Sequence, residues 1–165
     1  MRADWEIERK FVVTYLPEEL LETRKPVIVR QGYVTAEGDH HVRIRDEGGK
    51  FTMTVKQGFG LKRLDTQISI SAEQFNDLWP LTQHMRVEKK RYRIGFCGHR
   101  LCLDVFSGHL APLILVEVAF ENEMQSRQFF PPDYAELEVT HRREYQHVNL
   151  ARMGLPDALA MANAY

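Results

Sequence analysis

The feature that most constrains this chain is a repeated alternation of apolar and polar residues, in short segments separated by Gly, Asp and Pro. A period of two residues places alternate side chains on opposite faces of a β-strand, and many short segments of this kind favour a sandwich or barrel over βαβ units. The pattern therefore predicts an α+β fold that is mainly β and antiparallel. The predicted strands are 5–14, 26–35, 41–46, 50–57, 62–70, 86–96, 100–106, 113–121 and 136–140.

Two local signals support this division of the chain. Gly48 and Gly49 lie between two alternating segments and supply the positive φ angles that a tight hairpin connection needs. Ser71 and Gln74 form a capping box, which predicts a helix at 71–79. Shorter helical turns are predicted at 17–23, 123–129 and 145–151, and a C-terminal helix or tail at 152–165.

Length and charge restrict the class of protein. A chain of 165 residues predicts a single domain over 1–165, since a second core would have too little chain to bury it. The 22 Lys and Arg balance 23 Asp and Glu, so no chain-wide basic field points to nucleic acid. The sequence lacks an apolar run long enough for a signal peptide or a membrane span, which predicts a cytoplasmic protein without membrane partners. Cys97 and Cys102 are too few for a disulfide framework or a zinc site.

The charged residues of the strands fall on the faces opposite the apolar residues. In 5–11, Glu6, Glu8 and Lys10 share one side, while Ile7 and Phe11 share the other. Cations prevail at 43–56 and 89–91, whereas carboxylates prevail at 6–8, 104, 117 and 138. The polar positions so assigned on later strands are Arg43, Arg45, Lys56, Arg63, Asp65, Gln67, Lys89, Arg91, Asp104, Glu117 and Glu138.

A solvated antiparallel face is the ordinary explanation for any one of these strands. The separation of signs between strands is unlike the mixed charges of an exposed face, and it favours a closed sheet with a charged interior. Such burial is costly unless a charged ligand compensates it. Arg and Lys bind phosphate oxygens, and carboxylates bind Mg²⁺ or Mn²⁺, so a phosphate ligand with divalent ions would explain both signs.

The sequence EIERKF at 6–11 resembles the ExExK signature of the CYTH domain, the triphosphate tunnel metalloenzyme family. The resemblance covers nearly the whole chain and implies an eight-stranded antiparallel β-barrel, or tunnel, with flanking helices. Further blocks resemble the family in order: VRIR at 42–45, TVK at 54–56, RLDTQISI at 63–70, EKKRY at 88–92, LDVF at 103–106, LVEV at 115–118 and EVT at 138–140.

The resemblance also implies an activity and its residues. It implies a metal-dependent hydrolase of a small triphosphate, above all inorganic tripolyphosphate to diphosphate and phosphate, with Mg²⁺ or Mn²⁺ as cofactor. It implies catalytic roles for Glu6, Glu8, Lys10 and Glu117, and metal binding by Glu6, Glu8 and Glu117 with Asp104 and Glu138 as further candidates. It implies substrate binding by Lys10, Arg43, Arg45, Lys56, Lys89, Arg91 and Tyr33.

Other functions of the same fold stay open at this point. The chain could bind triphosphate or polyphosphate without hydrolysis, or act as a class IV adenylate cyclase or a thiamine triphosphatase, and a homodimer is a candidate assembly. Ala119 stands where the family pattern usually has a second glutamate, and Asp65 and Gln67 stand where both residues are usually glutamate. The seven His show no metal-ligand spacing and are expected at the surface.

Overall fold

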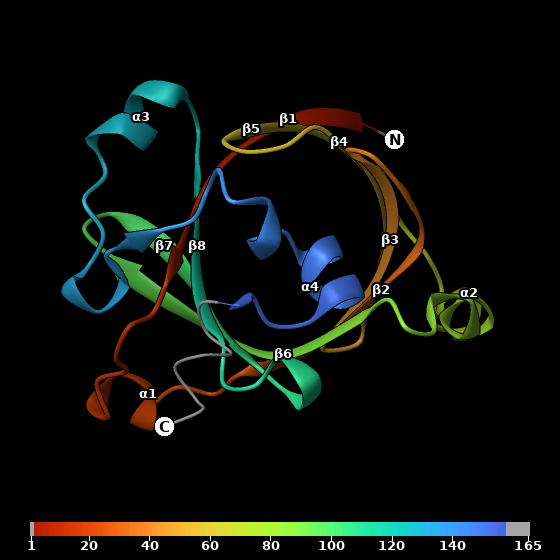
Figure 1. Cartoon of the computed structure of the whole chain (residues 1–165), viewed down its shortest axis with the longest axis horizontal. Coiled ribbons are helices and arrows are strands. Elements are labelled where there is room, and N and C mark those ends of the chain that lie inside the picture. Colours follow the sequence, from red (N-terminus) through yellow and green to blue (C-terminus); the bar gives the residue numbers. More distant parts are fainter. Residues whose placement is uncertain (1, 158–165) are drawn as a thin grey trace.

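The computed structural model describes residues 2–157, most of which form a closed antiparallel barrel (Figure 1). The order around the barrel is β1–β5–β4–β3–β2–β6–β7–β8, and β8 returns to β1. This confirms the predicted fold. The barrel strands are β1 (Arg2–Val12), β2 (Val27–Glu37), β3 (His40–Glu47), β4 (Lys50–Gln57), β5 (Lys62–Ser69), β6 (Arg86–Phe96), β7 (His99–Phe106) and β8 (Ile114–Phe120).

Strand β1 closes the barrel by pairing with a different strand along each half. Its first half pairs with β5, where Glu6 lies opposite Arg63, and its second half pairs with β8, where Lys10 lies opposite Glu117. The short strand β9 (Leu137–Glu138) pairs with the end of β1. The glutamates of β1 therefore lie where the pairing of β1 changes from β5 to β8.

The flanking helices begin and end close to their predicted positions. Helix α2 (Ala72–Leu78) lies outside the barrel near β2 and β3 (Figure 1), and its predicted capping box forms, with Ser71 Oγ 3.0 Å from the Gln74 amide. In the β3–β4 turn, Gly48 and Gly49 have φ angles of 61° and 89°. The other short helices are α1 (Glu19–Glu22), η1 (Trp79–Thr82), η2 (Gly108–Leu110), α3 (Glu123–Gln128), η3 (Asp133–Ala135) and η4 (Arg143–Tyr145).

Helix α4 (His147–Met153) and the short helix η4 before it lie inside the ring of strands, unlike α1, α2 and α3 (Figure 1). Leu150 of α4 belongs to an apolar cluster with inward-facing residues such as Val12 and Phe106. A second cluster, which includes Phe11 and Phe129, covers the outer face of the barrel near α3. The lumen is therefore charged in its middle and apolar at the end that α4 fills.

The predicted helix or tail at 152–165 is described only in part. Helix α4 ends at Met153, and residues 158–165 lie outside the described residues. Within residues 2–157, no helix has both the length and the apolar character needed to cross a membrane.

Candidate active site

The lumen contains a cavity of about 120 Å³ between the charged strands and the N-terminal end of α4. Almost all of its lining is polar or charged, and Val148 is the one aliphatic residue among the described residues that line it. The lining residues are Glu6, Glu8, Tyr33, His41, Arg43, Arg45, Lys56, Arg63, Asp65, Gln67, Arg91, Glu117, Gln146, His147 and Val148.

The two glutamates of β1 are held by cations of β4 and β5. Arg63 Nη2 donates to Glu6 Oε2 at 3.1 Å and to Glu8 Oε1 at 3.2 Å. Lys56 Nζ donates to Glu6 Oε2 at 3.3 Å. Because Glu6 and Glu8 share a face and Arg63 lies opposite Glu6 in register, this contact follows from the strand pairing.

The two glutamates nevertheless have opposite pKa shifts. Burial and the like charges of Glu117 and Glu6 raise the pKa of Glu8 to about 8. Burial also acts to raise the pKa of Glu6, but Lys56 and the other nearby cations lower it well below its usual value. Negative charge is thus crowded around Glu8, where an additional cation would be stabilised.

Three guanidinium groups of the cavity lining have donors that are not all used. The Nε atoms of Arg43, Arg45 and Arg63 are buried, and they donate no hydrogen bond to any group within residues 2–157. Burial, together with Arg43 and Arg91, lowers the pKa of Arg45 to about 10, so it remains charged near neutral pH. Buried cations with free donors favour an anionic ligand in this cavity.

Asp104 organises a buried group of charges beside the cavity. Arg91 Nε and Nη2 donate to its two carboxylate oxygens at 2.8 Å each, and Lys89 Nζ donates at 2.7 Å. Burial lowers the pKa of Lys89 to about 8, although Asp104 opposes this shift. Both oxygens of Asp104 are therefore engaged by cations of β6, and Arg91 is the member of this group that also lines the cavity.

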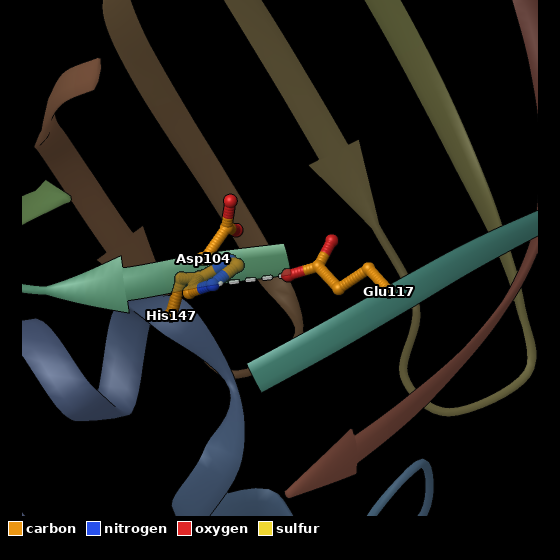
Figure 2. A group of neighbouring side chains, drawn as sticks. All are labelled: Asp104, Glu117 and His147. Atoms are coloured by element: carbon orange, nitrogen blue, oxygen red, sulfur yellow. Dashed lines mark ion pairs between the residues drawn. The ribbon is translucent and has the colours of Figure 1, made fainter. Parts of the chain in front are cut away.

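His147 connects α4 with this group (Figure 2). Its Nε2 lies 3.1 Å from Glu117 Oε1 and 3.4 Å from Lys89 Nζ. One potential ligand atom from each of Asp104, Glu117 and His147 lies within 4.8 Å of the others. Burial and the nearby Lys89 lower the pKa of His147 well below its usual value, so the imidazole is neutral.

Glu6, Glu8 and Glu117 fit a divalent cation better than Asp104 does. Their like charges raise the pKa of Glu8. Glu117 Oε1 is buried, and its 3.1 Å contact with His147 Nε2 is not aligned as a hydrogen bond. Hard carboxylate oxygens of this kind are the ligands that Mg²⁺ and Mn²⁺ prefer. Both oxygens of Asp104 accept from Lys89 and Arg91, whereas the contacts of Glu6 and Glu8 with Lys56 and Arg63 use one oxygen of each glutamate.

The structure brings most of the predicted site residues together, with four exceptions. Lys10 lines a separate small cavity with Glu8 and donates to the Tyr145 carbonyl at 3.1 Å, while Lys89 and Asp104 lie behind the cavity wall. Glu138 is not brought to the cavity, because its side chain lies outside the lumen and accepts from Arg9 at 2.8 Å. The residues that do line the cavity as predicted are Glu6, Glu8, Tyr33, Arg43, Arg45, Lys56, Arg91 and Glu117.

Seven lining residues were not among the predicted site residues: His41, Arg63, Asp65, Gln67, Gln146, His147 and Val148. Arg63 and His41 lie on inward faces, so the alternation of apolar and polar residues in β5 and β3 already indicated that they face the lumen. The expectation that the histidines lie at the surface is wrong for His41 and His147, since both are buried. Gln146 and His147 enter the lumen because the chain turns back into the barrel at α4, which no local pattern indicates.

This geometry defines a class of protein, a closed β-barrel whose lumen is lined by cations and carboxylates. The sequence profile of the CYTH domain matches residues 4–150. The chain is 43% identical over 148 residues to an inorganic triphosphatase from Nitrosomonas europaea, covering 88% of this chain and 96% of that protein. It is 32% identical over 149 residues to an inorganic triphosphatase from Acetivibrio thermocellus, covering 89% of this chain and 93% of the relative.

Solved structures agree with this relationship. A crystal structure of an inorganic triphosphatase superposes with a TM-score of 0.68 at 39% identity, covering 92% of this chain and 100% of the other. A putative adenylate cyclase from Bacillus halodurans superposes with a TM-score of 0.57 at 21% identity, over 77% of this chain and 86% of the other. That second likeness concerns the fold alone. The chain belongs to the CYTH family.

Proposed function

We propose that this protein hydrolyses inorganic triphosphate to diphosphate and phosphate, with a divalent metal ion bound by the carboxylates of the lumen. The observation that carries the proposal is the buried cavity, where Arg43, Arg45 and Arg63 present unused donors in the same lumen as Glu6, Glu8 and Glu117. The triphosphatase relatives, similar over almost their whole length, support the same activity.

The cations of the chain would bind and orient the substrate. Arg43, Arg45 and Lys56 lie on β3 and β4 and face the cavity, where they can neutralise the negative charge of adjacent phosphate groups. Phosphoryl transfer depends mainly on such positioning and charge stabilisation, so the protein requires no covalent nucleophile. Arg91 is held rigid by Asp104 and adds a fixed positive charge on the β6 side.

Glu6, Glu8 and Glu117 would hold the metal ion, which we expect to be Mg²⁺ or Mn²⁺. When bound, such an ion polarises a phosphate oxygen and activates water as the attacking nucleophile. Arg63 bridges Glu6 and Glu8 and keeps the two carboxylates in place. The cytoplasmic location, the homodimer and the single domain over 1–165 remain predictions from the sequence.

The cavity favours a substrate without a large organic group. Tyr33 is the only six-membered aromatic ring among its described lining residues, and nearly all the others are charged or polar. The proposal is tested by measuring phosphate release from tripolyphosphate with Mg²⁺ and with Mn²⁺, beside ATP and thiamine triphosphate. If the protein is folded by circular dichroism and releases no phosphate from tripolyphosphate with Mg²⁺ or with Mn²⁺, the proposal is contradicted.

A further inference from the structure

His41 is a buried histidine whose hydrogen-bonding groups are unused. It lies on β3 opposite Lys56 of β4, and 5% of the residue is exposed. Neither Nδ1 nor Nε2 has a hydrogen-bond partner within residues 2–157. The ring makes an edge-on contact with Tyr33, with the two ring centroids 5.6 Å apart. A buried polar side chain of this kind, facing a cavity, points to a ligand.

The position of His41 within the lumen indicates which part of a ligand it meets. Glu6, Glu8 and Glu117 line both the inner cavity and a larger neighbouring cavity of about 560 Å³, whose wall includes the exposed Ala119. This larger cavity is the mouth of the lumen. His41, in contrast, lines the inner cavity and does not line the mouth.

Uncharged side chains close part of the corner around His41, beside the cations Lys56 and Arg43. Tyr33 and Val148 line it, and both belong to the apolar cluster that α4 forms at its end of the lumen. A phosphate chain that reached from the carboxylates into this corner would end there. Its terminal phosphate could not carry a further substituent, because Tyr33 is only 2% exposed and the wall behind it is apolar.

The chemistry of His41 suits a phosphate oxygen. Burial and the neighbouring cations Lys56 and Arg43 lower the pKa of His41 to about 4, so the ring is neutral and carries one N–H donor. A neutral donor binds a phosphate oxygen without adding positive charge to Lys56 and Arg43. The other ring nitrogen can accept a hydrogen bond from a protonated phosphate oxygen or from water.

We propose that His41 is a substrate-binding residue, which donates a hydrogen bond to a terminal phosphate beside Lys56 and, with Tyr33, requires that phosphate to be unsubstituted. The inference rests on the proposed hydrolysis of triphosphate, and it extends that proposal by defining the inner end of the binding site.

The test replaces the ring with one that fills the same space but forms no hydrogen bond. In His41→Phe, we expect the KM and the calorimetric Kd for tripolyphosphate to rise about tenfold, the range for a lost hydrogen bond to a charged group, while kcat changes less than about threefold. His41→Gln, which restores a donor, should recover most of the affinity. The matched control is His40→Phe, since His40 is the exposed neighbour on the other face of β3.

The outcomes separate this inference from the proposed activity. If wild type hydrolyses tripolyphosphate and His41→Phe binds it as tightly as His40→Phe does, the role of His41 is wrong and the activity stands. If wild type binds tripolyphosphate but releases no phosphate, the activity is wrong and the Kd values still decide on His41. Failure of wild type to bind tripolyphosphate would overturn both. In a dinucleoside triphosphate both terminal phosphates are substituted. Competition by such a compound would contradict the claim that the phosphate at His41 must be unsubstituted.

Discussion

The middle of the lumen and the end filled by α4 are built from the same strands but differ in their chemistry. On β1 the inward face changes from Lys10 to Val12, and on β7 it changes from Asp104 to Phe106. A step of two residues along a strand therefore separates a charged region from an apolar one. The comparison teaches that ligand binding and stabilisation of the fold belong to different regions along the barrel axis, the first to the charged middle and the second to the apolar end.

The two regions contribute to the free energy of unfolding in opposite ways. In the charged middle, Glu8 lies near Glu6 and Glu117, and Arg45 lies near Arg43, so like charges oppose folding. In the apolar end, fully buried side chains such as Leu150 stabilise the fold by about 1.5–3 kcal/mol each. Substitutions in the two regions should therefore have separable effects on activity and stability.

Glu8→Gln should give the largest effect and the clearest separation. Because the pKa of Glu8 is about 8, the metal-free protein carries this group largely protonated at pH 7, and glutamine resembles that form. We expect kcat/KM to fall about 10²- to 10³-fold, while the free energy of unfolding changes by less than about 1 kcal/mol. Phosphate release and urea denaturation measure the two quantities.

Glu138→Gln is the matched control for this change, since Glu138 accepts from Arg9 outside the lumen. It should retain wild-type activity. A loss of activity equal to that of Glu8→Gln would show that the division between lumen and exterior carboxylates is wrong.

Leu150→Ala tests the apolar end. The side chain is 0% exposed within the cluster around α4, so its truncation should lower the free energy of unfolding by about 3 kcal/mol. Below the unfolding transition, kcat/KM should change less than about threefold. Met153→Ala on the same helix removes a residue that is 70% exposed and should change stability by less than about 0.5 kcal/mol. Equal destabilisation by the two variants would contradict a stabilising role for the buried face of α4.

The pH dependence of stability tests the boundary between the two regions, where His41 lies. The folded pKa of His41, about 4, is below the 6.5 of an exposed histidine, so its contribution is present above pH 6.5 and is lost as the pH falls towards 4. Between pH 7 and pH 5 this loss should be about 2 kcal/mol. Urea denaturation should show that His41→Phe loses less stability than wild type over this interval. An identical loss in both proteins would mean that His41 is accessible to protons in the folded state.

Ala119→Glu should have the smallest effect and would sharpen the description of the mouth. Ala119 lies opposite Glu8 in register, so a glutamate there would add a carboxylate beside the proposed metal ligands. We expect the Mg²⁺ concentration that gives half-maximal activity to fall about threefold. The melting temperature in EDTA should fall slightly, because a further negative charge would face Glu8. A higher Mg²⁺ requirement would show that the carboxylate set is already complete.

Much of this architecture could be predicted from the sequence, because alternation is a local signal. It identified β4 and β6 with the bounds they have in the structure, and it placed Glu6, Arg43 and Lys56 on inward faces. The resemblance to the CYTH family then supplied closure of the sheet and the expected activity, and both agree with the relatives.

The remaining features depend on contacts between distant segments. Glu138 was misplaced because β9 has only two residues and its pairing with β1, opposite Phe11, decides the direction of the side chain. His147 reaches Glu117 through the path of the whole C-terminal segment. The engagement of Lys89 by Asp104 depends on the register between β6 and β7. Alternation predicts the face of a strand, but it does not predict such partners.

The closure of the barrel by β1 has a consequence for synthesis of the chain. The first strand pairs with β8, so the contact between Lys10 and Glu117 joins residues more than a hundred positions apart. On a ribosome, the second half of β1 must wait for its partner until most of the chain has been translated, and α4 emerges later still. Pairing at such long range slows folding. The glutamates of β1 are thus made well before the strand and the helix that complete their pocket.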